Sequence, residues 1–189
     1  MPDVKHFDPD AVLDEVMALF WKRGAASTGI QDIVTATGLN RSSLYSTFGG
    51  KHDLYLAALR RYVRERSQPV FDQLAGEESG LAAVEVFFAR LVQVRCTGPH
   101  ARWGCMVANA HANGENDDPE ISAVLHEHHD QLGKALRAAL EREPGLRLAP
   151  AQAADMLAML AYGVNLRSRA GADRKALNAT VKAALSALV

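Results

Sequence analysis

Residues 28–48 read Thr28-Gly-Ile-Gln-Asp-Ile-Val-Thr-Ala-Thr-Gly-Leu-Asn-Arg-Ser-Ser-Leu-Tyr-Ser-Thr-Phe48, and the architecture of the chain follows from them. Apolar side chains recur at helical spacing on both sides of a turn at residues 37–40, which predicts two short helices. Ile33 before the turn, Leu39 within it and Leu44 after it would lock the two helices together. This is the helix-turn-helix pattern, whose second helix enters the DNA major groove.

The second of these helices carries polar side chains on its outer face. Asn40 can cap it, because its side-chain oxygen can accept from a free backbone N–H group at the helix start. Thr28 is expected to cap the preceding helix in the same way, and the free N–H groups at both starts favour phosphate oxygens. The outward candidates for base contacts are Arg41, Ser42, Ser43 and Ser46. Arginine can bond guanine in a bidentate manner, and serine hydroxyls can bond bases or phosphates.

The rest of the chain also has helical periodicity, and no clean alternating run predicts a strand. A first helix is expected between its cap at Asp8 and its stop at Gly24, and another from Lys51 to about Ser67. Pro69 and residues 75–80 interrupt the helical pattern, and the helices expected beyond them are longer. Further helices are predicted at about 80–96, 103–112, 119–142, 150–168 and 173–188. The predicted fold is all-α, with a three-helix head followed by a larger helical body.

Composition and charge narrow the class of protein. The chain has 189 residues, 48% hydrophobic and 23% charged, which is typical of a globular protein. No apolar run approaches the roughly 18–20 residues of a membrane span, and the start, MPDVKHFDPD, does not resemble a secretion signal. A soluble cytoplasmic protein without membrane attachment is therefore expected. The net charge of −1 divides into −4 for residues 1–15, +5 for 16–66 and −2 for 67–189, so the head is basic, as in nucleic-acid-binding modules.

Over roughly residues 12–62 the chain resembles the TetR family of bacterial transcriptional regulators. The resemblance is carried by Phe20, Gly24, Thr28-Gly29-Ile30, Ile33, Thr37-Gly38-Leu39-Asn40, Leu44-Tyr45, Phe48-Gly49-Gly50-Lys51 and Leu54. It implies that Tyr45, Lys51 and Thr28 contact DNA phosphates and that residues 41–43 and 46 face bases. Asn40 stands where the family often has serine, a change that keeps the capping chemistry.

The resemblance also implies a division of the chain and a set of partners. Residues 1–50 would form the helix-turn-helix DNA-binding domain, 51–66 a connecting helix, and 67–189 an effector-binding and dimerisation domain. The implied protein is a homodimer, paired through its last two helices, that represses transcription from a palindromic double-stranded operator. An unknown small-molecule effector would release it.

The body contains large side chains that could line an effector pocket between helices, although the same spacing is also that of ordinary core. The candidate pocket residues are Phe87, Phe88, Leu91, Cys105, Met106, Leu125, His129, Met156, Met159 and Tyr162. Cys105 follows Arg102 near an expected helix start, and both features favour a reactive thiolate. A Gly-Cys pair here also resembles a branch of the family with electrophile-sensing members, whereas the simpler alternative is a small buried residue at a helix crossing.

The segment His126-Glu-His-His-Asp130 suggests two further alternatives. His126, His129 and Asp130 are close on one helical face, so they could make the protein a metal-responsive regulator or a metal-dependent enzyme. Nothing else in the sequence supplies an obvious closing ligand, and HExxH, nucleophile-elbow and phosphate-loop motifs are missing from it. We therefore expect no enzyme activity, no cofactor and no bound metal. A helical module that binds only other proteins is disfavoured by the charge difference between head and body.

Overall fold

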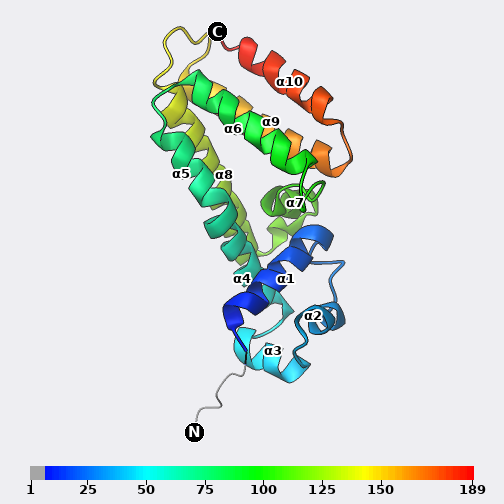
Figure 1. Cartoon of the computed structure of the whole chain (residues 1–189). Helices are drawn as coiled ribbons and strands as arrows, with labels where there is room; N and C mark the ends of the chain where they lie inside the picture. The colour runs from blue at the N-terminus through cyan, green and yellow to red at the C-terminus, as the bar shows by residue number, and fades with distance from the viewer. Residues whose placement is uncertain (1–6) are drawn as a thin grey trace.

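The structure is a computed structural model that describes residues 7–189, and throughout this range it is helical without strands, which confirms the all-α prediction. The assessment of the N-terminus as no secretion signal falls partly on residues 1–6, which lie outside the described range. The helices are α1 (Pro9–Arg23), α2 (Ile30–Thr37), α3 (Arg41–Phe48), α4 (Lys51–Tyr62), α5 (Gln68–Gly76), α6 (Leu81–Cys96), α7 (Met106–Ala112), α8 (Pro119–Leu140), α9 (Pro150–Arg169) and α10 (Arg174–Ser186). Figure 1 shows α1–α3 at one end of the molecule and α6, α9 and α10 at the other.

The ends of the head helices follow from capping chemistry. Asp8 caps α1 by accepting from the Asp10 N–H at 2.9 Å, and α1 stops at Gly24, whose φ of +84° is unfavourable for other residues. Asn40 caps α3 by accepting from the Ser43 N–H at 2.8 Å. Both predicted caps are confirmed.

The predicted cap at Thr28 is wrong. Gly29 occupies the cap position of α2, and its N–H donates to the Asp32 carboxylate at 2.8 Å. Thr28 is fully buried, and its hydroxyl donates to the Gly24 carbonyl at 2.8 Å. Its side chain therefore satisfies the end of α1 instead of the start of α2.

The expected end of the connecting helix near Ser67 is also wrong. The chain stays helical from Lys51 to Gly76, passing through a π-helical turn at Val63–Ser67 and then through Pro69 in the first turn of α5. A proline inside a regular helix lacks a donor and clashes with the carbonyl four residues back. The widened turn just before Pro69 accommodates the proline within a continuous helix.

The buried apolar side chains form two clusters. One lies in the body and joins α5, α6, α9, α10 and the second half of α8. The other joins α1–α4 to α7 and the first half of α8. Because α7 and the first half of α8 belong to the cluster of α1–α4, the head and the body share apolar packing at their junction.

The junction of head and body is also hydrogen-bonded. The indole N–H of Trp21 on α1 donates to the Gly104 carbonyl, just before α7, at 2.8 Å, and this bond is buried. In the part of the chain from residue 7 onward, no helix combines the length and apolar character that crossing a bilayer requires.

Candidate nucleic-acid interface and effector cavity

The outer surface of α3 is polar and accessible. Arg41, Ser42 and Ser46 are exposed, and Tyr45 is 40% exposed, while Leu44 faces inward and is buried. The Arg41 guanidinium lies over the Tyr45 ring at 5.6 Å, one helical turn away. Arginine in this position keeps its hydrogen-bond donors free for a base or phosphate while its stem packs on the ring.

Two other features border α3. Asn40 is exposed at its start, and Ser43 behind it is half-buried with its N–H held by the Asn40 side chain. After α3, the Gly50 N–H donates to the Asp53 carboxylate at 2.9 Å and sets the first turn of α4. Lys51 begins α4 and is half-buried. The side chains of Asn40, Arg41 and Lys51 thus belong to one continuous segment around α3.

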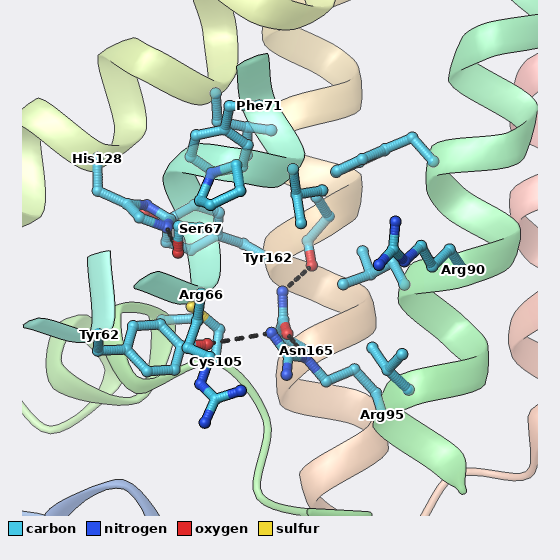
Figure 2. A pocket seen from close by; sticks show the side chains of 18 of the residues that line it. Tyr62, Arg66, Ser67, Phe71, Arg90, Arg95, Cys105, His128, Tyr162 and Asn165 are labelled. Atoms are coloured by element: carbon cyan, nitrogen blue, oxygen red, sulfur yellow. Dashed lines mark hydrogen bonds between the residues drawn. The ribbon is translucent and has the colours of Figure 1, made fainter. Parts of the chain in front are cut away.

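A cavity of about 370 Å³ lies where the head meets the body. Its wall combines side chains of α1, the π-helical turn, α5–α9 and the loop before α7. Figure 2 shows Phe71 and His128 on one side of this space and Arg95 on the other. The lining residues are Trp21, Tyr62, Glu65, Arg66, Ser67, Pro69, Val70, Phe71, Phe87, Arg90, Leu91, Val94, Arg95, His100, Cys105, Ala108, His128, Leu132, Ala161, Tyr162 and Asn165.

Polar side chains in this wall are held in fixed positions. The guanidinium of Arg95 donates through Nε to Asn165 Oδ1 at 2.6 Å and through Nη2 to the Tyr62 hydroxyl at 3.2 Å. His128 is only 4% exposed, and its Nε2 lies 3.1 Å from the Ser67 hydroxyl. Its other ring nitrogen, Nδ1, and the Tyr162 hydroxyl are buried without a hydrogen-bond partner among residues 7–189. Buried polar groups left in this state favour a ligand or water that pairs with them.

Cys105 is the cap residue of α7 and lies in the same wall. Burial acts to raise the pKa of its thiol, but the neighbouring His128 imidazole and the positive charge of Arg95 outweigh it, so the thiol pKa lies below its ordinary value. A larger thiolate fraction makes a cysteine a better nucleophile at neutral pH. The half-buried Cys96 differs, because burial raises its thiol pKa.

Sequence relatives identify the family. Residues 12–58 match the profile of "Bacterial regulatory proteins, tetR family". The "HTH-type transcriptional repressor ComR" of Escherichia coli is 30% identical over 179 residues, covering 92% of this chain and 85% of that protein. The chain belongs to the TetR family. The "Uncharacterized HTH-type transcriptional regulator YezE" of Bacillus subtilis is 29% identical, covering 73% of this chain and 71% of its own.

A solved TetR-family structure has the same fold over the whole chain. It is the regulator CifR, as a triple cysteine mutant in complex with 26-base-pair double-strand operator DNA. The two proteins are 25% identical, with a TM-score of 0.84, over 99% of this chain and all of that one. Family membership makes the present chain a helix-turn-helix transcriptional regulator.

The structure brings together four of the ten candidate pocket residues: Phe87, Leu91, Cys105 and Tyr162 line the cavity. Phe88, Met106 and Leu125 are not part of the cavity wall, because their side chains fill the two apolar clusters. Met156 and Met159 are 48% and 65% exposed. On α9, Leu157, Ala158 and Ala161 face the core, and Ala161 also lines the cavity. The two methionines therefore lie on the opposite, outer side of the helix.

On α8 the cavity histidine is His128, whereas the candidate His129 is exposed. Helical spacing could have found it, because His128 is four residues after Val124 and four before Leu132, both of them buried. Arg90 and Arg95 on α6 carried no such signal, since a charged residue at a helix surface is usually solvated.

The proposed metal cluster is not assembled. His126 Nδ1 lies 2.8 Å from the Ser122 carbonyl of its own helix, and Asp130 is exposed. Within residues 7–189 no three His, Cys, Asp or Glu side chains come together in a way that could hold a metal ion. The relatives found by sequence are regulators.

A histidine next to Lys51 ties the head of this TetR-family protein to the body. His52 Nε2 lies 2.6 Å from the Asp118 carboxylate at the cap of α8, and its Nδ1 lies 3.3 Å from Asp53. The pKa of His52 is raised, first by the hydrogen bond to Asp118 and then by that to Asp53. A histidine with a raised folded-state pKa stabilises the fold below its unfolded pKa of about 6.5, and this stabilisation is lost as the pH rises through the folded value.

We predict that raising the pH from about 6 to about 9 lowers the melting temperature of the wild-type protein more than that of His52→Gln. Thermal unfolding followed by circular dichroism at the two pH values measures the difference. His129→Gln, which changes an exposed histidine on α8, serves as the matched control and should behave as wild type. An equal pH response of wild type and His52→Gln would show that the contact to Asp118 contributes nothing.

Proposed function

We propose that the protein is a homodimeric transcriptional repressor that binds a palindromic operator and is released by a small molecule in the cavity of about 370 Å³. The observation that carries the proposal is the capped, outward-facing α3, with Arg41, Ser42 and Ser46 exposed on a basic head. The operator complex of CifR and the repressor name of ComR support the same conclusion. A regulator of this kind works on chromosomal DNA and therefore in the cytoplasm.

In this proposal the residues around α3 have distinct roles. Arg41, Ser42, Ser43 and Ser46 contact bases, and the N-terminal turn of α3, capped by Asn40, faces phosphate. Tyr45 and Lys51 bind phosphates on the two sides of the groove. Thr28 has no direct role, because its hydroxyl is buried and already bonded to Gly24.

The first experiment selects bound fragments from random duplex DNA and then measures affinity by fluorescence anisotropy. We expect Arg41→Ala to cost about 1–3 kcal/mol on the selected operator and to relax the preference at one base position in each half-site. Lys51→Gln should weaken binding to all sequences and reduce the salt slope by about 1. Arg137→Gln removes an exposed arginine of α8 and is the control. Failure to retain any duplex at low salt would refute DNA binding.

Dimerisation is proposed through α9 and α10. Met156, Met159 and Leu166 are exposed and lie within one side of α9, where apolar side chains are expected only at an interface. On α10 the exposed alanines Ala176, Ala179 and Ala183 share a face, and small side chains let a partner helix approach closely. A two-fold dimer would set two copies of α3 roughly 34–36 Å apart, one helical turn of DNA.

We predict that Met159→Glu yields a monomer in sedimentation velocity and loses most of its operator affinity, because an ionised carboxylate would be buried in an apolar contact. Val86→Glu is the matched control, since Val86 is 64% exposed but lies on α6. A Met159→Glu protein that stays dimeric would place the interface elsewhere.

Release requires that the effector bind two states of the protein with different affinity. Trp21 of α1 is part of the cavity wall, so a change in the cavity displaces a head helix directly. Cys105 adds a second candidate mode, in which an electrophile reacts with the thiol. The lowered thiol pKa and the position in the cavity wall favour this mode.

We predict that iodoacetamide releases the wild-type protein from operator DNA but leaves Cys105→Ser bound, while both bind DNA equally before treatment. In the reaction the Cys105 thiolate forms a bond to carbon and iodide leaves. Cys96→Ser is the control and should respond as wild type, because the Cys96 thiol has a raised pKa. Equal release of Cys105→Ser and wild type would remove this cysteine from the mechanism.

A further inference from the structure

The cavity wall carries more positive than negative charge. Three arginines line it, Arg66, Arg90 and Arg95, and Glu65 is its one carboxylate among residues 7–189. Glu65 is already engaged outside the cavity, with Arg61 at 3.2 Å and Arg64 at 3.3 Å. The three cavity arginines therefore do not share a neutralising acid.

The hydrogen-bond partners of Arg90 and Arg95 are neutral. Arg90 donates to the Gln73 side chain at 3.2 Å, and Arg95 donates to Asn165 and Tyr62. Elsewhere the chain pairs arginine with carboxylate, as in Arg23 with Asp32 at 2.9 Å and Arg137 with Glu141 at 2.8 Å. A Cys105 thiolate would offset one of the three charges at most. A partly buried guanidinium with neutral partners, such as that of Arg95, can bind an anion through charge-assisted hydrogen bonds, so this wall favours an anion.

Part of the cavity wall is apolar. Phe71, Phe87 and Leu132 lie there in the buried core, and Leu91 adds a partly buried surface. His128 Nδ1 and the Tyr162 hydroxyl, which have no hydrogen-bond partner within residues 7–189, belong to the same wall and can pair with a second polar atom. A volume of about 370 Å³ is at the small end of ligand pockets, which span about 300–1,000 Å³.

We propose that the cavity binds a small amphipathic carboxylate, with its anionic group at Arg95, in the positive field of Arg66 and Arg90, and its apolar body against Phe71, Phe87 and Leu132. The inference rests on the proposed function, because it names the class of effector for that site. Arg66 and Arg90 are exposed while Arg95 is partly buried, so the carboxylate lies toward the mouth and the apolar body points inward. Figure 2 shows this separation between Arg95 and Phe71.

The test measures binding of two carboxylates, 2-naphthoate and octanoate, and of their neutral amides, 2-naphthamide and octanamide, by isothermal titration calorimetry without DNA. Each amide matches its acid in shape and differs in charge. We expect at least one acid to bind about tenfold or more tightly than its amide, as for hydrogen bonds to a charged group. Equal binding of acid and amide in both pairs, or binding of neither acid, would overturn the proposal.

Variants locate the anion. Arg95→Gln should weaken binding of the acid about tenfold and leave that of the amide nearly unchanged. Because Arg95 bonds Tyr62 and Asn165, the double variant Arg66→Gln/Arg90→Gln, at two exposed positions, tests the same charge without disturbing this network. Arg137→Gln, on α8 away from the cavity, is the matched control. An acid affinity unchanged in both cavity variants would place the anion elsewhere and refute the site.

A second measurement separates this inference from the proposed function. The same acids are added to the protein bound to its selected operator. If an acid binds the cavity but the operator complex stays intact, the ligand class stands and release by such ligands fails. If other compounds release the operator while no acid binds in calorimetry, the repressor function stands and the carboxylate proposal fails.

Discussion

The buried hydrogen bond from the Trp21 indole to the Gly104 carbonyl fixes α1 of the head against the loop before α7. The same indole packs edge-on against Tyr62 at 5.0 Å and stacks on His100 at 4.9 Å, and all three rings line the cavity. Trp21 is thus a residue of the DNA-binding head and also part of the wall that a ligand would touch. A signal from the cavity to α1 needs no chain of intermediate residues.

The partner of Trp21 can only be glycine. Gly104 has a φ of +67°, and a Cβ added there would lie 2.9 Å from the Asn109 side chain and 3.1 Å from the Asn165 carbonyl. This close approach draws the loop before α7 onto α9 and aims the Gly104 carbonyl at the indole. It also places the next residue, Cys105, at the start of α7 beside His128. The position of the thiol is therefore a result of the same backbone geometry.

Much of this architecture was predictable because its signals are local. The caps at Asp8 and Asn40, the helix-turn-helix spacing and the helices α6–α10 depend on neighbours in sequence, and the structure confirms them, whereas α5 was not predicted. The cavity was less accessible to prediction, since it combines residues from many separate elements. Met156 and Met159 have the same spacing as cavity residues, and only the packing of α9 shows that they face outward. The predicted cap at Thr28 was wrong for a related reason. Its hydroxyl donates to the Gly24 carbonyl at the end of α1 and is not available to the start of α2.

The π-helical turn between α4 and α5 links the head to the body through a single continuous helix. The consecutive residues Glu65, Arg66 and Ser67 of this turn all line the cavity. One residue more or less in this segment would rotate everything beyond it by about 100°. The number of residues in this segment therefore sets the direction in which α3 faces relative to the body. For this reason the segment tolerates substitutions far more readily than insertions or deletions.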